Sequence, residues 1–292
     1  MNDNPAYAVV PYNSWPAVGM ANTPLDSLHW PLGRPERLAR GTVRDMGPQD
    51  HLIAYPNSEL FYAPWLGIRA QVSVMIVEPD AVHAKNLKRA YRWRKSFRSI
   101  LTKSESLLAQ IDNGIFFYFG STFIDDISGI NPEKSRHMSL IASGKRDLEG
   151  HQLRHRMIDF VREKGLDVDV MGRGYKPFER KADGLESYRF SLIIENVRER
   201  HYFTEKIVDA ALCRTVPIYW GCPNIGDYFD TDGILICETE EQVRDALQRV
   251  NAEDYAARSI AIEENARRAK FYADYLERAA LTVQSGKACH YA

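Results

Sequence analysis

The sequence predicts an α/β protein built on parallel sheets. Short apolar runs bounded by polar or turn residues are typical of buried strands, and they recur from about residue 70 onward. From residue 137 these runs alternate with segments of helical period, a pattern that indicates a parallel sheet covered on both faces. The chain has 292 residues, about twice a common domain length, which favours two domains.

The first part of the chain changes character near residue 70. Residues 1–65 are rich in Pro, Trp and Tyr and contain chain breakers such as Gly47-Pro48, so they predict loops carried on a few short elements. Strands are then expected at residues 72–77, 99–102 and 115–119. The polar stretch 125–134 has no apolar period and contains Gly and Pro, so we place a domain boundary there, between residues 1–130 and residues 131–292.

The second domain is predicted in more detail. Its expected strands are residues 137–143, 166–171, 190–194, 216–219 and 234–237, and its expected helices are residues 149–164, 205–213 and 240–250. Gly165 stands where a C-cap residue would end the first of these helices. Residues 252–281 are also predicted to be helical, with Ile262, Ala266, Ala269, Tyr272 and Leu276 on one side.

Composition excludes several classes of protein. With 45% hydrophobic and 26% charged residues the chain is globular, and its formal net charge of −1 gives the whole molecule no long-range attraction to nucleic acid. The four cysteines form no CxxC pair, so we expect free thiols and no zinc knuckle. The N-terminus lacks the pattern of a signal peptide, and no apolar run approaches the roughly 18 residues of a spanning helix, so we expect a cytoplasmic location.

The strand, loop and helix between Phe190 and Lys206 are the best candidate for a binding site. In an open parallel sheet, ligands bind outside the carboxyl ends of the strands, where helix N-termini attract phosphate. Thr204 is a favourable N-cap residue, and Lys206 in the first helical turn would add a full positive charge. A diphosphate would fit there, although such a run on its own is more typical of ordinary helix capping and solvated charge.

Four runs of residues together resemble the donor-binding signature of glycosyltransferase family 10, the alpha-1,3-fucosyltransferases. Their order, spacing and residue types match those of the family: Val168–Gly174, Tyr188–Asn196, Tyr202–Lys206 and Val216–Gly221. The resemblance covers about residues 137–250. It implies a GT-B enzyme, in which two Rossmann-like domains face each other across a cleft and GDP-fucose binds to the C-terminal domain. Residues 1–130 would then bind the acceptor and residues 131–292 the GDP-sugar donor.

The resemblance also implies roles for single residues. Asn196, Tyr202 and Lys206 would hold the diphosphate, and Glu205 would contact the ribose or the donor sugar. Arg154 aligns with the family's diphosphate arginine, although a surface cation on a helix is an equally good explanation of this residue taken alone. Departing GDP leaves charge on phosphate oxygens, which fixed cations stabilise. No metal or other cofactor is therefore expected, and the GDP-sugar is a co-substrate.

The catalytic base is expected in the first domain. An inverting transfer is one displacement, so a single carboxylate suffices as base. The strand at 72–77 ends in Glu78-Pro79-Asp80, and the family has its base glutamate at the end of a comparable strand. We therefore choose Glu78, with Asp80 as the alternative. The family's run is longer at this point, and the rest of the N-terminal half matches it little, so Glu78 as a plain loop carboxylate stays open.

Two other motifs carry less weight. Asp167-Val168-Asp169 is similar to the DxD metal site of other glycosyltransferases, but both carboxylates lie in a predicted strand, so we assign them no metal. Gly172-Arg173-Gly174 lacks the third glycine of a dinucleotide fingerprint.

Residues 85–98 contain seven cations interleaved with aromatic residues: Lys85, Lys88, Arg89, Arg92, Arg94, Lys95 and Arg98. A solvated helix face is the ordinary explanation. The alternative is peripheral contact with anionic lipid at the inner face of a membrane, which would suit an enzyme that builds a cell-surface polysaccharide from the cytoplasmic side. The expected partners are thus a GDP-sugar donor and a carbohydrate or glycolipid acceptor, with no nucleic acid.

These observations predict an inverting, metal-independent glycosyltransferase that moves fucose, or a related 6-deoxyhexose, from a GDP-sugar to a hydroxyl of a carbohydrate acceptor in a bacterial-type surface glycan. Two alternatives stay open. The same fold would serve another donor sugar, such as the amino-dideoxyhexose perosamine, or the protein would be a non-catalytic module that binds nucleotide sugars or anionic surfaces.

Overall fold

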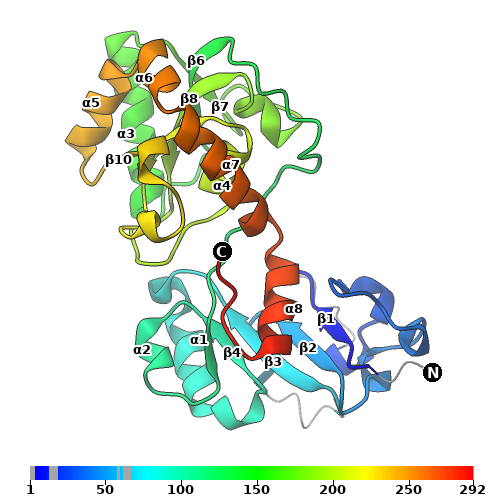
Figure 1. Ribbon diagram of the computed structural model, residues 1–292. Coiled ribbons are helices and arrows are strands. Elements are labelled where there is room, and N and C mark those ends of the chain that lie inside the picture. The colour runs from blue at the N-terminus through cyan, green and yellow to red at the C-terminus, as the bar shows by residue number, and fades with distance from the viewer. Residues whose placement is uncertain (1–3, 13–18, 58–59, 62–66, 292) are drawn as a thin grey trace. The chain divides into compact units, whose positions relative to one another are not determined.

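The computed structural model describes residues 4–12, 19–57, 60–61 and 67–291. The chain divides into two compact units (Figure 1), the first running to Tyr118 and including Tyr275–His290, the second comprising Phe119–Asp274. Each unit contains a five-stranded parallel sheet with helices against it. The predicted α/β class with parallel sheets is therefore confirmed.

The first unit is built on a sheet whose strands follow one another in chain order, β1-β2-β3-β4-β5. These strands are β1 (Tyr7–Val9), β2 (His51–Ala54), β3 (Gln71–Ile76), β4 (Ile100–Thr102) and β5 (Gly114–Phe116). Its helices are α1 (Asp80–Arg92), α2 (Glu105–Leu108) and α8 (Tyr275–Ser285). Buried apolar side chains from β2 and β3, such as Leu52, Val74 and Ile76, form the centre of its core.

The sequence located β3, β4 and β5 but not β1 and β2. These two strands have three and four residues and lie among breakers, so no apolar period reveals them. The structure also assigns α8, which packs on β1, to the first unit, whereas the sequence-based boundary grouped this helix with residues 131–292.

The second unit has the strand order β10-β9-β8-β6-β7, with all neighbours parallel. The strands are β6 (Arg136–Ile141), β7 (Val168–Met171), β8 (Tyr188–Ile194), β9 (Val216–Trp220) and β10 (Leu235–Ile236). The helices are α3 (Glu149–Lys164), α4 (Glu205–Leu212), α5 (Glu240–Arg249), α6 (Ala252–Ala257) and α7 (Ser259–Ala273). Every strand and helix predicted in this region is present, with ends that differ by a few residues.

Local sequence explains these elements. β8 lies at the centre of the sheet, and its apolar run is buried on both faces, as is typical of a parallel sheet. α3 ends at Gly165, which adopts the left-handed conformation with φ of 60°. Thr204 caps α4 by accepting a hydrogen bond from the backbone N of Lys206.

The C-terminal segment is helical as predicted, but it is divided into α6, α7 and α8. The side chains of Ile262, Ala266, Ala269 and Tyr272 are buried in α7, so the predicted apolar side is confirmed for this helix. Leu276 was predicted on the same side, but it is half-buried and belongs to α8. The hydroxyl of Tyr272 donates to the carbonyl of Tyr228 at 2.9 Å. Among the described residues, no helix is both long enough and apolar enough to cross a bilayer.

The strand order of the second unit predicts where a ligand binds. From β6 the chain passes through α3 to β7 on one side of the sheet, and β8 then lies on the other side of β6. In doubly wound sheets such a reversal opens a crevice beyond the carboxyl ends of the two strands that flank it. Here those ends are Ile141 of β6 and Ile194 of β8.

Candidate functional site

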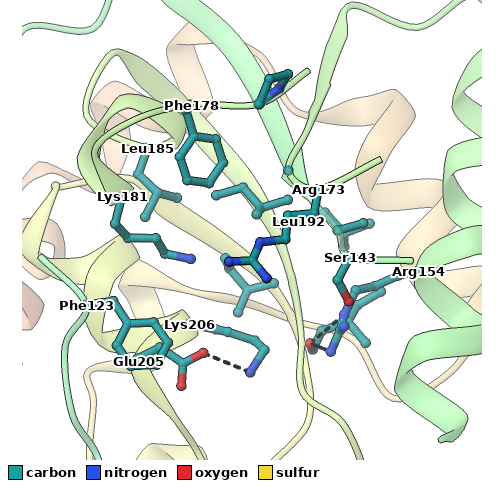
Figure 2. Close-up of a pocket in the computed structure, with 16 residues that line it drawn as sticks. Phe123, Ser143, Arg154, Arg173, Phe178, Lys181, Leu185, Leu192, Glu205 and Lys206 are labelled. Carbon is teal, nitrogen blue, oxygen red and sulfur yellow. Dashed lines mark hydrogen bonds and ion pairs between the residues drawn. The ribbon is translucent and has the colours of Figure 1, made fainter. Parts of the chain in front are cut away.

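A pocket of about 460 Å³ occupies this crevice in the second unit. The ends of β6, β7 and β8 contribute its floor, with Ser143, Gly172 and Ile194 among the lining residues. Figure 2 shows Arg154 on one side of the pocket and Phe123 and Lys181 on the other, with Arg173 and Lys206 between them. The pocket therefore combines cations with an apolar part formed by Phe123, Phe178, Leu185 and Leu192.

A glycine brings α3 to the edge of the pocket. The backbone N of Gly150 donates to the carbonyl of Asn196 at 3.0 Å. A Cβ atom at Gly150 would lie 1.8 Å from the carbonyl oxygen of Glu195, so only glycine allows this approach. The first turn of α3 is thereby packed against the loop that follows β8.

This close approach places Arg154. Its Nε and Nη2 donate to the carbonyl of Ile194 at 3.1 and 2.8 Å, and Nη2 also donates to Oδ1 of Asn196 at 2.9 Å. Only 7% of Arg154 is exposed, and this burial lowers its pKa, although an arginine stays charged in proteins. Within the described part of the chain Nη1 has no hydrogen-bond partner, so one arm of the guanidinium faces the pocket with its donors available.

The start of α4 is fixed by a buried carboxylate, Glu195. Its Oε1 accepts from the backbone N of Thr204 at 2.9 Å, and its Oε2 accepts from Oγ1 of Thr204 at 2.8 Å. Nζ of Lys206 lies 3.4 Å from the same Oε2 and 3.1 Å from Oε1 of Glu205. The end of β8 and the first turn of α4 therefore form one hydrogen-bonded unit.

These contacts determine the charge in the pocket. Burial alone would lower the pKa of Lys206, but Glu195 and Glu205 raise it above its ordinary value. Burial alone would raise the pKa of Glu205, but Lys206 and Lys181 lower it. Both groups are therefore ionised at neutral pH. Against one lining carboxylate stand four lining cations, Arg154, Arg173, Lys181 and Lys206, so the pocket favours a ligand with several negative charges.

The structure brings most of the predicted donor residues together. Arg154, Glu205 and Lys206 line the pocket around the ends of β8 and α4, and Lys206 and Glu205 form an ion pair. Asn196 accepts a hydrogen bond from Arg154 but is not one of the lining residues. Tyr202 lies on the loop before α4, is buried, and does not line the pocket. The contact between Tyr202 and a diphosphate that the resemblance implies therefore has no counterpart in the lining of this pocket.

The candidate bases lie in the first unit, directly after β3. Glu78 is half-buried, and its Oε1 accepts from the hydroxyl of Tyr12 at 3.3 Å. Burial, and then the charge of Glu78, raise the pKa of Tyr12. Asp80 opens α1, where Nζ of Lys103 and Oγ of Ser104 donate to it at 3.1 and 2.6 Å. Two donors therefore engage the carboxylate of Asp80.

Sequence reasoning missed several lining residues. Arg173 was quoted only as part of a glycine turn, and Lys181 lies in a short 3₁₀ helix, Lys181–Gly184, within a stretch without apolar period. Phe123 lies close to the polar stretch assigned as a linker. None of these had a local signal, because their role depends on which strands end beside them. Glu195 did have one, because a carboxylate directly after a buried strand needs a partner.

The DxD run has a structural explanation. Oδ2 of Asp169 accepts from Nη1 of Arg136 and from the hydroxyl of Tyr188, both at 2.7 Å. Asp167 precedes β7 and is exposed. The carboxylate of Asp169 thus accepts hydrogen bonds from side chains on β6 and β8.

Comparisons with known proteins agree with this geometry. Residues 131–233 match the model of the glycosyltransferase family 10 (fucosyltransferase) C-terminal domain. An alpha-(1,3)-fucosyltransferase of Helicobacter pylori is 33% identical over 113 residues, which are 39% of this chain and 21% of that protein. A fucosyltransferase-like protein of Arabidopsis thaliana is 26% identical over 137 residues, which are 46% of this chain and 26% of the Arabidopsis protein. The chain thus spans about a quarter or less of the length of these two relatives.

Solved structures show the fold over a longer part of the chain. The match to a crystal structure of an alpha1,3-fucosyltransferase with GDP covers 91% of this chain and 84% of the fucosyltransferase chain, with 15% identity and a TM-score of 0.53. The match to a crystal structure of a UDP-forming trehalose-phosphate synthase from Burkholderia vietnamiensis covers 82% of this chain and 72% of the synthase chain, with 11% identity and a TM-score of 0.54. The two parallel-sheet units are those of the GT-B fold. The resemblance to glycosyltransferase family 10 that the sequence predicts is confirmed over residues 131–233, which match the C-terminal domain of that family.

Proposed function

We propose that this protein is a glycosyltransferase that moves fucose, or a related 6-deoxyhexose, from a GDP-sugar to a hydroxyl of a carbohydrate acceptor. The observation that carries the proposal is the cation-rich pocket at the reversal of strand order, with the N-terminus of α4 at its edge. A nucleoside diphosphate matches this site because it joins two phosphates to a planar, partly apolar base. The match of residues 131–233 to the fucosyltransferase family supports the choice of donor.

The donor residues follow from the network around β8 and α4. The free arm of Arg154 and the ammonium of Lys206 line the pocket and would hold the diphosphate. The resemblance also assigns Asn196, which is bonded to Arg154, to the diphosphate. Glu205, ionised and beside Lys206, is suited to accept hydrogen bonds from the hydroxyls of the ribose or the sugar. The resemblance gives Tyr202 a contact with the diphosphate, and a Tyr202→Phe variant with unchanged GDP affinity would remove that assignment.

In the proposed reaction the acceptor oxygen attacks C1 of the donor sugar while the bond from C1 to the β-phosphate oxygen breaks. The electron pair leaves with GDP, where Arg154 and Lys206 stabilise the charge that develops. The acceptor's proton passes to the carboxylate of Glu78, which we propose as the base. A single displacement inverts the anomeric configuration, which NMR of the product measures directly.

We propose that this transfer does not require a metal ion. Four cations already line the pocket and can balance the charge of a diphosphate. Transfer should therefore continue at the same rate in the presence of a chelator such as EDTA. Loss of activity with EDTA, and its return with Mg²⁺ or Mn²⁺, would contradict this part of the proposal.

Donor binding is tested by calorimetry with GDP, UDP and dTDP. GDP should bind most tightly, and Lys206→Ala should weaken it about ten-fold or more, since a charge-assisted bond to phosphate is lost. Lys270→Ala, an exposed lysine on α7, is the matched control and should bind GDP like the wild type. Equal affinity for all three nucleotides, or an unaffected Lys206→Ala variant, would count against a GDP site.

Turnover is tested with labelled GDP-fucose and a mixture of carbohydrate acceptors. Glu78→Gln should keep its affinity for GDP but lose transfer by about 100-fold or more, because a general base contributes about that factor. A fully active Glu78→Gln enzyme would remove Glu78, and Asp80 would be examined next. GDP binding with no transfer to any acceptor would favour a non-catalytic binding module.

The identity of the sugar is the open part of the donor. Among the assigned residues, Glu205 alone is proposed to bind hydroxyl groups, those of the ribose or of the sugar, so no assigned residue distinguishes one hexose from another. The same pocket would accept GDP-perosamine, an amino-dideoxyhexose donor. Competition between GDP-fucose and GDP-perosamine in the transfer assay separates these two donors.

We further propose that residues 1–130 bind the acceptor, and that the acceptor is a bacterial-type surface glycan or its glycolipid precursor at the cytoplasmic side of a membrane. The support is the basic surface of α1 and the residues after it. Among the described residues none of its seven cations has an ion-pair partner: Lys85, Lys88, Arg89, Arg92, Arg94, Lys95 and Arg98. The net charge of the chain is −1, so all residues other than these seven cations together carry a net charge of −8. Such asymmetry favours peripheral contact with anionic lipid.

Vesicle sedimentation tests this contact. The protein should bind phosphatidylglycerol vesicles and not phosphatidylcholine vesicles, and added salt should release it. Reversal of Lys85, Lys88 and Arg92 to Glu should weaken binding about ten-fold or more. Reversal of three exposed cations elsewhere, Arg249, Lys270 and Lys287, is the matched control. Equal binding to both kinds of vesicle would leave the basic stretch as a solvated helix face.

A further inference from the structure

Phe123 is an exposed aromatic residue at the edge of the pocket. It is 60% exposed, yet it belongs to the lining of the pocket together with Lys181 and Phe178. In Figure 2 these three residues lie on the side of the pocket opposite Arg154. Single exposed apolar residues are common, so exposure alone would mean little. What distinguishes Phe123 is that its backbone is fixed.

Three hydrogen bonds fix the segment that carries Phe123. Oγ1 of Thr122 donates to Oδ1 of Asp209 at 2.5 Å, and the backbone N of Phe123 donates to the same oxygen at 3.1 Å. Oγ1 of Thr122 also accepts from the backbone N of Ile124 at 3.0 Å. The side chain of Asp209 therefore fixes the backbone from which the ring of Phe123 projects.

Asp209 is an unusual residue for its position. It lies one turn after Glu205 in α4 and is wholly buried, and burial raises its pKa to about 7. Within the described residues its Oδ2 has no hydrogen-bond partner, and the nearest cation is Nζ of Lys181 at 4.0 Å. A buried carboxyl oxygen without a hydrogen bond costs stability. The two hydrogen bonds that Oδ1 accepts, from Thr122 and Phe123, offset part of this cost, so the carboxylate serves to fix that segment.

Both groups that Asp209 faces are lining residues of the pocket. The segment at Thr122 and Phe123 is bonded to Oδ1, and Lys181 faces Oδ2. One buried carboxylate thus holds an aromatic ring on one element and an ammonium group on another at the same end of the pocket. Arg154 lies on the opposite side of the pocket, and Lys206, in the first turn of α4, lies between the two sides (Figure 2). The diphosphate is proposed to bind at these two cations.

We propose that Asp209 is a positioning residue that holds Phe123 as one face of a nucleobase subsite, where the ring stacks on the base of the bound nucleoside diphosphate. The inference rests on the proposed function and extends it to the base. If the phosphates lie at Arg154 and Lys206, the base must occupy the rest of the pocket, where Phe123, Phe178 and Leu185 provide apolar surface. The ammonium of Lys181 is suited to the acceptor atoms O6 and N7 of guanine.

The first experiment compares a ligand that has a base with one that has none. Calorimetry measures GDP and inorganic pyrophosphate binding to the wild type, Phe123→Ala, Phe123→Tyr and the control Tyr91→Ala, an exposed aromatic of α1. Phe123→Ala should raise the Kd for GDP about ten-fold, the effect of losing a stacked base, and leave pyrophosphate unchanged. Phe123→Tyr and Tyr91→Ala should match the wild type. An unchanged Kd for GDP in Phe123→Ala would overturn the inference.

The second experiment asks whether Asp209 acts through Phe123. Asp209→Ala should weaken GDP binding to a similar extent, and the double variant Asp209→Ala, Phe123→Ala should bind GDP no more weakly than Phe123→Ala alone. Asp209→Asn should retain most of the affinity, because an amide oxygen still accepts both hydrogen bonds. Additive losses in the double variant would overturn the positioning role. If Asp209→Ala does not fold, Thr122→Val removes the hydrogen bond from Thr122 to Asp209 and replaces Asp209→Ala in the comparison with Phe123→Ala and the double variant.

The outcomes separate this inference from the proposed function. A wild-type protein that does not bind GDP would end the proposed function itself. A wild-type protein that binds GDP more tightly than pyrophosphate, with Phe123→Ala doing the same, keeps the function and overturns only the subsite.

Discussion

Nζ of Lys206 lies 3.4 Å from Oε2 of Glu195, a carboxylate with no exposed surface. Glu195 is the first residue after β8, and Lys206 is in the first turn of α4. Their contact joins the central strand of the second sheet to the helix whose N-terminus faces the pocket. The cation that would meet a phosphate is therefore held by the sheet itself.

Glu195→Gln should lower both stability and donor affinity. Replacing the carboxylate removes the counter-charge of Lys206 and a charged acceptor for Thr204, a loss of about 2 kcal/mol in the free energy of unfolding. Urea denaturation measures this change. Glu241→Gln, at an exposed position of α5, should change stability by less than about 0.5 kcal/mol. Equal midpoints for the two variants would mean that Glu195 does not stabilise the start of α4.

Gly150→Ala should disturb the site, although alanine normally favours a helix. The added Cβ would meet the carbonyl oxygen of Glu195 at 1.8 Å, so α3 must move away from β8 and carry Arg154 with it. We expect a loss of about 1–3 kcal/mol in the free energy of unfolding and weaker GDP binding. Gly144→Ala, where a Cβ meets nothing within 4 Å, is the matched control and should keep both properties.

The pH dependence of stability should reveal Asp209. Its pKa of about 7 in the folded protein is above the ordinary value of 3.8, so the folded state binds this proton more tightly than the unfolded state. The wild type therefore loses stability as the pH rises from about 4 to 7. Asp209→Asn removes this loss, so its melting temperature relative to the wild type should rise between about pH 4 and pH 7. Asp245→Asn, an exposed position, should show a difference that does not change with pH.

The cysteines should differ in reactivity. Burial raises the pKa of Cys213 to about 12, of Cys222 to about 11 and of Cys237 to about 11. Cys289 is half-buried near the C-terminus. A thiol reagent at about pH 8 should therefore label one thiol per native chain and all four after denaturation. Rapid labelling of a Cys289→Ala variant would contradict this expectation.

The sequence predicted the second unit better than the first. Its strands are continuous apolar runs and its helices have clear caps, such as Thr204 before α4 and Gly165 after α3. These signals act within a few residues and are visible in the sequence. In the first unit β1 and β2 are too short to show a period, so the sheet begins at Tyr7, long before the first predicted strand.

The candidate site was predicted only in part for a related reason. Asn196, Glu205 and Lys206 lie in one strand-loop-helix segment whose chemistry can be read locally. Arg173 and Lys181 carry no such signal, because their side chains meet the pocket only through the path of the chain between β7 and β8. The same is true of Phe123, which Asp209 holds from 86 residues away.

By itself the sequence determined the α/β class, the ends of most elements in the second unit and the capped, lysine-bearing start of α4. The tertiary structure alone decided that Arg154 meets the carbonyl of Ile194, 40 residues away, and that Phe123 stands across the pocket from it. Capping and periodicity depend on neighbours in the chain. The pocket depends on the strand order β8-β6-β7 and on the close approach at Gly150, which short-range patterns do not encode.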